Sequence, residues 1–315
     1  MSVTSIFRNG SPVLKASLLL ASSTVIAGSV WAEWKDRQVR ADYPGFKTLH
    51  FSTSTGNRIQ IALSDGVWSQ GKPLFILIPG LSSSISTVAG LAYGLKEQGY
   101  QVLMYNRAGY GDSVRLAEEP FHTGEFVEDL WSVINQLSLD NADAEEKPIH
   151  LVGHSLGGYL AYKFAHEHHD QVDSITYLDP LHPNELKASQ AQRMGSTSLD
   201  LTMRTVPPFM RFGAALLYSN PNILSYAERY EFLNRVKADL ASPSIWRAAQ
   251  QEWKRMYPLL LDGETIFTLP ERIRTRVIAA EETVRVDPHQ RELYFEYSPI
   301  VENLEGARHQ NMLTD

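Results

Sequence analysis

Short apolar runs that alternate with helix-like segments constrain the fold of this chain most strongly. Four runs, 74–78, 101–105, 149–152 and 175–178, are mainly apolar along their whole length. Such runs are typical of strands covered on both faces, as in a parallel sheet. The segments between them have helical periodicity, and 124–137 carries a wide apolar face that can cover the sheet. The alternation predicts an α/β fold with a doubly wound, mostly parallel sheet.

The remaining segments set the limits of the predicted domains. Residues 47–63 predict two strands around the turn Thr55-Gly56-Asn57, and 276–280 predict a late strand. From 181 to 270 the alternation stops, and helical patterns rich in aromatic residues and methionine replace it. We therefore expect a core formed by residues 33–180 and 271–315, interrupted by a helical lid or cap at 181–270. Helices are also expected at 86–98 and 156–168.

The first 32 residues have the pattern of a secretory signal peptide. Arg8 and Lys15 precede an uncharged stretch, 16–32, which ends in the small residue Ala32. Cleavage before Glu33 would make the protein secreted or periplasmic. The stretch is short and serine-rich for a membrane span, which needs about 20 apolar residues. An uncleaved N-terminal membrane anchor and a soluble N-terminal helix stay open as alternatives.

Composition excludes several classes of function. The chain has 29 Lys and Arg against 36 Asp and Glu, a net charge of −7, which argues against nucleic acid or an anionic membrane surface as the main partner. It has no cysteine, so disulfides, thiolate metal sites and a cysteine nucleophile are ruled out. His166, His168 and His169 end a predicted helix without a carboxylate cluster, which is typical of solvated histidines. We expect no metal and no cofactor; the oligomeric state is left open.

Gly153-His154-Ser155-Leu156-Gly157 matches the G-x-S-x-G pattern of a nucleophile elbow. A serine that rises above a sheet edge must sit on a very tight turn, and small neighbours let the strand and the helix approach each other. The motif falls between the apolar run 149–152 and the predicted helix 156–168, which is the context that it requires. The N–H groups at the start of that helix would point at the site. The pattern predicts that Ser155 is a nucleophile.

With this motif and others, the chain resembles the α/β-hydrolase family over residues 47–180 and 270–309. The stretch 78–84 resembles the family's oxyanion loop, with Pro79 where histidine is more usual. The resemblance implies an oxyanion hole made by the backbone N–H groups of Leu81 and Leu156. The loop 106–113 is similar to the family's RGxGxS segment, and we interpret it as a structural turn.

The same resemblance places the base in a loop near the C-terminus. His309 has that position, and His182 and His289 are the alternatives. The acid that orients the base has two candidates. Asp179 ends the run 175–178, and Glu282 follows the late strand, one position before the site where the family carries its aspartate.

A hydrolase of carboxylic esters is the function that these residues predict, with Ser155, His309 and Asp179 or Glu282 as the catalytic triad. The aromatic-rich insertion favours lipophilic acyl or small apolar substrates. Acyltransferase, thioesterase and peptidase activities use the same triad and stay open. A catalytically silent binding protein is the alternative from a different class.

Overall fold

An eight-stranded sheet organises the protein. The computed structural model describes residues 11–39, 42–66, 68, 72–139, 149–214, 230–309 and 312–313. The strand order is β1-β2-β4-β3-β5-β6-β7-β8, with antiparallel pairing at β1–β2 and β2–β4 and parallel pairing elsewhere. The strands are β1 (Phe46–Ser52), β2 (Arg58–Ser64), β3 (Leu74–Ile78), β4 (Gln101–Tyr105), β5 (Ile149–His154), β6 (Val172–Leu178), β7 (Arg274–Ala280) and β8 (Val301–Leu304). The predicted mostly parallel α/β fold is confirmed.

Two apolar cores lie on opposite faces of the sheet. Alternate residues of a strand point to opposite faces, and on β3 Ile76 belongs to one core while Leu77 belongs to the other. The larger core packs the sheet against α4 (Thr123–Leu139) and α5 (Leu156–Glu167), and the smaller against α3 (Ala89–Glu97). After β7 the chain forms α12 (Glu281–Val286) and α13 (His289–Tyr297).

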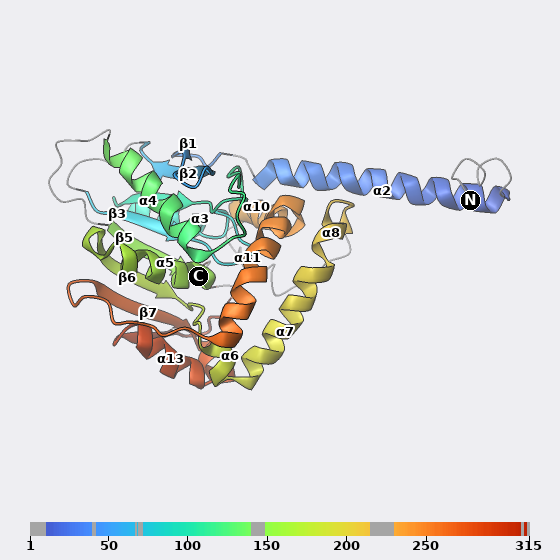
Figure 1. Ribbon diagram of the computed structural model, residues 1–315. Coiled ribbons are helices and arrows are strands. Elements are labelled where there is room, and N and C mark those ends of the chain that lie inside the picture. The colour runs from blue at the N-terminus through green and yellow to red at the C-terminus, as the bar shows by residue number, and fades with distance from the viewer. Residues whose placement is uncertain are drawn as a thin grey trace.

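Helices fill the described part of the segment between β6 and β7. They are α6 (Glu185–Ala188), α7 (Gln190–Thr205), α8 (Pro207–Met210), α10 (Tyr230–Ala241) and α11 (Pro243–Asp262), and we call them the cap. Figure 1 shows the cap helices grouped on one side of the sheet. Because the chain enters the cap at the end of β6, the cap lies at the carboxyl edge of the parallel strands.

A long helix, α2 (Pro12–Val39), precedes the sheet. It runs without a break through the predicted cleavage site before Glu33, and its N-terminal half projects from the body (Figure 1). Its other half packs on α10 and α11. Within the described residues, no helix combines the length and the hydropathy that a membrane span requires.

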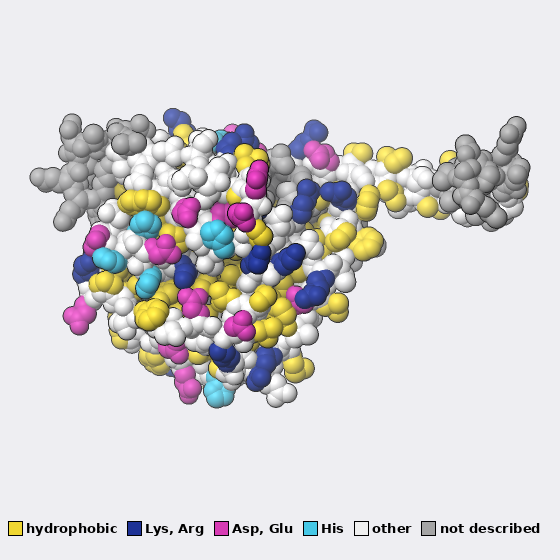
Figure 2. Space-filling model, in the orientation of Figure 1, with side chains coloured by type: hydrophobic (Ala, Val, Ile, Leu, Met, Phe, Trp, Pro, Cys, Tyr) yellow, Lys and Arg dark blue, Asp and Glu magenta, His cyan; other side chains and the backbone are white. Residues whose placement is uncertain are grey.

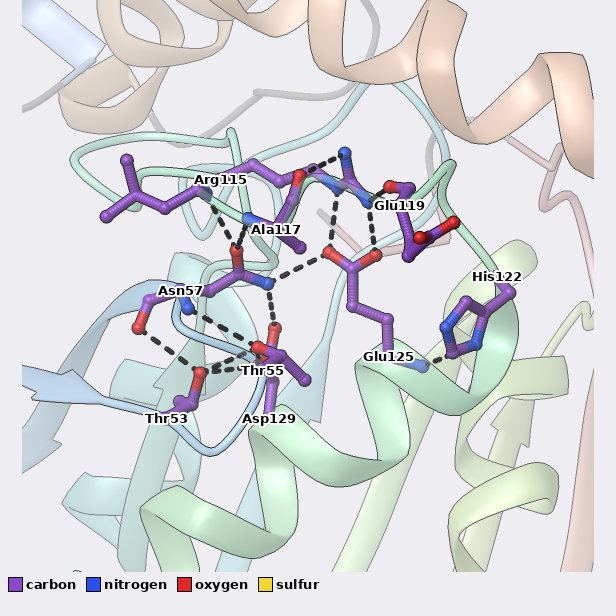
Figure 3. Close-up of polar contacts among 10 residues, drawn as sticks. Thr53, Thr55, Asn57, Arg115, Ala117, Glu119, His122, Glu125 and Asp129 are labelled. Atoms are coloured by element: carbon purple, nitrogen blue, oxygen red, sulfur yellow. Dashed lines mark hydrogen bonds and ion pairs between the residues drawn. The ribbon is translucent and has the colours of Figure 1, made fainter.

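A buried polar cluster ties the β1–β2 turn to α4 (Figure 3). The Asn57 amide donates to Glu125 and to Asp129, at 2.9 Å in each case. Arg115 donates to both oxygens of Glu125, at 2.7 and 2.6 Å, and Thr53 donates to Asp129 at 2.6 Å. Burial raises the pKa of Asp129 although three hydrogen bonds oppose it. The cluster anchors the hairpin turn that the sequence predicts at 55–57.

Two local predictions differ from the structure. The predicted helix at 86–98 begins at Ala89, because the hydroxyls of Ser84 and Ser86 bind Asp239 of α10 in the preceding turn. The edge strand β8 has no counterpart among the predictions. Three of its four residues are exposed and one is charged, so its sequence lacks the apolar run that marks the inner strands.

Candidate active site

Ser155 lies on a sharp turn between β5 and α5. Its backbone has φ 52° and ψ −123°, a conformation that L-residues rarely adopt and that costs about 1–3 kcal/mol. Three backbone hydrogen bonds hold the turn: the Ser155 N–H donates to the Leu178 carbonyl at 3.1 Å, and its own carbonyl accepts from Gly158 at 2.9 Å and from Leu181 at 3.0 Å. The motif therefore forms the elbow that its spacing predicts.

Close backbone contacts explain the glycines of the motif. A Cβ atom at Gly153 would lie 2.3 Å from the Gly157 carbonyl oxygen, and a Cβ atom at Gly157 would lie 2.1 Å from the Ile78 carbonyl oxygen. Neither backbone neighbour can yield without disrupting the sheet or the helix. The glycines thus let β3, β5 and α5 meet at one point beneath Ser155.

A cavity of about 540 Å³ opens above this turn. Its lining includes five of the six site residues that the sequence predicts, namely Ser155, Leu81, Asp179, Glu282 and His309. Of the four described non-glycine residues with positive φ, three line this cavity: Ser82, Ser155 and Asp179. Unfavourable backbone conformations cluster at functional sites because the surrounding structure must hold them in place.

His309 is joined to Asp179 within the cavity. The Nδ1 atom of His309 lies 2.6 Å from Oδ2 of Asp179, and the two residues come from the ends of different strands. The His309 side chain is 36% exposed, whereas that of Asp179 is fully buried. Burial lowers the pKa of His309, but the hydrogen bond and the negative charge of Asp179 outweigh it, so the pKa is raised overall.

The Asp179 carboxylate accepts three further hydrogen bonds. The Ala280 N–H donates at 3.0 Å, the Tyr294 hydroxyl at 2.9 Å and the Thr283 hydroxyl at 2.6 Å. Burial raises the pKa of Asp179, but these donors and His309 outweigh it and lower the pKa overall. Asp179 is thus held as a carboxylate with a fixed orientation, and Thr283 occupies the position where the family resemblance places an aspartate.

Glu282 does not share this arrangement with His309. Its carboxylate lies 3.7 Å from Arg285 and 3.6 Å from Arg308, and its side chain is 39% exposed. Of the two candidate acids, the structure brings Asp179 to His309.

The two alternative histidines do not line the catalytic cavity. His182 is buried against the Tyr297 ring, and His289 is exposed beside Glu292.

His154, the neighbour of Ser155, holds the backbone of His309. Its Nε2 atom donates to the His309 carbonyl at 2.9 Å, and the two rings lie 4.8 Å apart. Burial lowers the pKa of His154 to about 3, so its imidazole is neutral. The contact gives His154 a structural role, which is to position the loop of His309.

The loop after β3 carries Leu81, the first predicted oxyanion donor. Leu156, the second, lies in the first turn of α5, where backbone N–H groups have no partner within the helix. Arg107 fixes the loop: its guanidinium donates to the carbonyls of Pro79 at 2.5 Å and Gly80 at 2.9 Å. The segment 106–113, interpreted above as a structural turn, thus supports the site directly.

Two buried carboxylates of the cap complete this support. Glu252 of α11 binds Arg107 at 2.6 and 3.0 Å and accepts from the Tyr110 hydroxyl at 2.6 Å. Asp239 of α10 accepts from the Ser84 N–H at 3.0 Å and from the Ser86 hydroxyl at 2.5 Å. Burial raises the pKa of Asp239 to about 6, although the hydrogen bonds oppose it. Neither carboxylate is among the site residues that the sequence predicts; the available signal is an acidic residue on the apolar face of an amphipathic helix.

Among the described residues, no group of three or more His, Asp or Glu side chains is placed to hold a metal ion. The chemistry that the site itself offers is that of a serine, a histidine and a carboxylate beside backbone N–H groups.

Comparison with known proteins places the chain in a family. The family model for the alpha/beta hydrolase fold matches residues 73–254. The chain belongs to the α/β-hydrolase fold family. It is 30% identical over 103 residues to the probable lysophospholipase L2 of Haemophilus influenzae. This match covers 31% of this chain and 32% of the relative. It is 25% identical over 194 residues to the probable lysophospholipase BODYGUARD 1 of Arabidopsis thaliana, covering 56% of this chain and 39% of the relative. The matched part is therefore 32% of the first relative's length and 39% of the second's.

Solved structures share the fold over most of the chain. The Cif epoxide hydrolase from Acinetobacter nosocomialis superposes with a TM-score of 0.65 over 91% of this chain and 93% of its own, at 12% identity. A likeness at this identity shows the fold alone. The family and the fold are therefore shown, and the curated relatives that the chain matches in part are named as lysophospholipases.

Proposed function

We propose that the protein hydrolyses carboxylic esters of lipophilic acyl groups through an acyl-enzyme intermediate. One observation carries the proposal: Ser155 stands on a strained elbow in the same cavity as His309, whose Nδ1 atom is bound to the buried carboxylate of Asp179. This is the set of roles that nucleophilic catalysis by a serine requires.

In the proposed reaction, the Ser155 hydroxyl attacks the ester carbonyl while Nε2 of His309 takes the hydroxyl proton. The N–H groups of Leu81 and Leu156 stabilise the oxyanion, and His309 then gives the proton to the departing alcohol. A water molecule, activated by His309 in the same way, hydrolyses the acyl-enzyme and releases the acid. Asp179 keeps the Nδ1 proton in place and stabilises the imidazolium.

The cap supports a lipophilic substrate. A groove of about 480 Å³ between α7 and α11 is lined by Met203, Trp253, Tyr257 and Pro258, among others. Trp253 also lines the catalytic cavity, so the two spaces adjoin at its ring. An acyl chain attached at Ser155 could extend past Trp253 into this groove and bury its methylenes, each worth about 0.8 kcal/mol.

The names of the relatives agree with ester hydrolysis, since lysophospholipases cleave acyl esters. The likeness to an epoxide hydrolase does not favour epoxide hydrolysis by this chain. In this fold, epoxide hydrolysis resembles a mechanism with an aspartate nucleophile, whereas this elbow carries serine.

Hydrolysis of a series of p-nitrophenyl esters of increasing acyl length tests the proposal. We expect turnover by the wild type that rises with acyl length and is lost in Ser155→Ala. Trp253→Ala should abolish the preference for long chains while short esters are still cleaved. Equal turnover by wild type and Ser155→Ala would reject the proposal.

A further inference from the structure

One face of the molecule exposes many apolar side chains where α2 leaves the body. On α2, Leu19, Leu20, Val25, Ile26 and Val30 are 45–71% exposed, and on the cap Phe209 and Phe212 are 61% and 48% exposed. We call these seven side chains the α2–α8 face. Figure 2 shows yellow side chains along α2 and at the adjoining edge of the cap.

A close backbone crossing joins the two parts of this face. A Cβ atom at Gly28 of α2 would lie 2.1 Å from the Phe212 carbonyl oxygen, and one at Gly213 would lie 2.6 Å from the Gly28 Cα atom. Gly28 and Ala32, one turn apart, are buried against the cap. The cap therefore fixes the direction in which the N-terminal half of α2 projects, and the Phe212 backbone lies against α2 at this crossing.

The projecting half of α2 has no single apolar stripe. The described side chains between residues 19 and 27 are all exposed, and the apolar ones include the neighbours Leu19 and Leu20 and the neighbours Val25 and Ile26. Adjacent residues of a helix point about 100° apart, so apolar atoms surround the axis. A helix that pairs with one partner helix needs one seam, whereas a helix that is apolar on all sides suits a surrounding apolar medium. Residues 12–27 span about 24 Å at 1.5 Å per residue, which is less than the ~30 Å of a bilayer's hydrocarbon core.

The segment that contains the cap carries more basic than acidic residues, which suits contact with an anionic surface. Residues 181–270 contain ten Lys and Arg against eight Asp and Glu, whereas the rest of the chain contains 19 against 28. Two of the eight acids, Asp239 and Glu252, are buried within the cap. Arg204 and Arg211 are exposed next to the α2–α8 face, at the end of α7 and just after α8, and Arg204 is paired with Asp200 at 2.7 Å. Arg193 is exposed at the other end of α7, and it shares an open groove on that helix with Arg204, Met194 and Leu201. The cap thus presents basic side chains to the outside of a chain that is acidic overall.

From these observations we infer that the α2–α8 face is a binding surface for an anionic lipid bilayer. The projecting half of α2 enters the lipid, Phe209 and Phe212 lie at the interface, and Arg204 and Arg211 contact acidic headgroups. The inference goes beyond ester hydrolysis and does not depend on it. It requires α2 to remain attached to the protein, so it favours the anchor alternative over cleavage before Glu33.

The position of α7 gives this surface a consequence for substrate access. Ala191, Gly195 and Leu199 line the catalytic cavity, while Met194 and Leu201 of the same helix are exposed, about 100° further round it. A lipid substrate held beside this part of α7 would therefore lie close to the catalytic cavity.

Flotation of the full chain with vesicles tests the inference. We expect binding to vesicles of phosphatidylcholine with phosphatidylglycerol, weaker binding to phosphatidylcholine alone, and at least about a tenfold loss for Leu20→Glu with Ile26→Glu. The matched control is Phe295→Glu with Ile300→Glu. Phe295 lies on α13 and Ile300 directly precedes β8, and their side chains are 50% and 47% exposed. This variant should bind like the wild type. Arg204→Ser with Arg211→Ser should remove the preference for the anionic lipid.

A second measurement does not depend on how the variants fold. Because the chain has no cysteine, Ile26→Cys and Phe295→Cys each provide a single site for an environment-sensitive dye. With brominated lipids, we expect quenching of the dye at position 26 and none at 295.

Three results would overturn the inference: equal quenching at both positions, a mature chain that begins at Glu33 by intact mass, or a lipid-free dimer that Leu20→Glu with Ile26→Glu disperses while no form binds vesicles. In the last case the face would be an interface with a second copy of the chain.

Discussion

The ion pair between Arg107 and Glu252 provides the most quantitative prediction. Both side chains are 2–3% exposed, and Arg107 donates both to Glu252 and to the carbonyls of Pro79 and Gly80. Removing one partner of such a pair leaves an uncompensated buried charge and costs about 3–5 kcal/mol. Glu252→Gln keeps one acceptor oxygen, so we expect a loss of about 3 kcal/mol in the free energy of unfolding, measured by urea denaturation.

A matched control distinguishes the effect of burial on the free energy of unfolding from the effect of removing a carboxylate. Glu264 binds Lys163 at 3.0 Å, but the two side chains are 28% and 21% exposed. Exposed pairs contribute about 0–1 kcal/mol, so Glu264→Gln should destabilise by less than about 1 kcal/mol. If Glu252→Gln changed the free energy of unfolding no more than this control, the reasoning about burial would be refuted.

A double variant separates stability from positioning. Arg107→Met with Glu252→Leu removes both charges, and such replacements are often neutral or stabilising. We expect stability to recover towards the wild type while ester turnover stays low, because the carbonyls of Pro79 and Gly80 no longer have their donor. Recovery of turnover together with stability would contradict the role of Arg107 in holding the loop that carries Leu81.

Three further predictions concern the titratable groups. Asp179→Asn should lower kcat by up to about 10⁴-fold, whereas Glu282→Gln should leave it nearly unchanged. A large loss of kcat in Glu282→Gln would show that Asp179 is not the acid. His309 must be neutral to act as a base and its pKa is raised above 6.5, so the acid limb of the kcat/KM profile should lie above pH 6.5 and move down in Asp179→Asn. The pKa of Asp239 is about 6 in the folded protein against an ordinary 3.8. Between pH 3.8 and 6 the folded protein therefore binds a proton that the unfolded chain releases, so the free energy of unfolding falls as pH rises through this range. Asp239→Asn should flatten this fall in a pH series of unfolding free energies.

The elements that the sequence predicts well are those marked by local patterns. The strands at 74–78 and 101–105 coincide with their apolar runs, and the elbow at Ser155 follows from the close spacing of its glycines. In each case the residues that set the structure are neighbours in the chain, so the pattern and the fold carry the same information.

The remaining features depend on residues far apart in the chain. Asp179 and Glu282 could not be separated locally, because the choice depends on β6 and β7 pairing side by side and on the donors that Thr283 and Tyr294 direct at Asp179. Glu252 resembles any acidic residue on an amphipathic helix until the fold brings Arg107 to it, 145 positions away. Long-range pairing of this kind leaves no periodic signal in the sequence.

Covalent labelling of Ser155 tests the central claim most directly. Folded wild-type protein treated with a fluorophosphonate should gain the mass of one probe, and peptide mapping should locate it in the segment that contains Ser155. Ser155→Ala should gain nothing, and Asp179→Asn should label much more slowly than Glu282→Gln. Labelling at another residue, or no labelling of correctly folded wild type, would contradict the proposed catalytic serine.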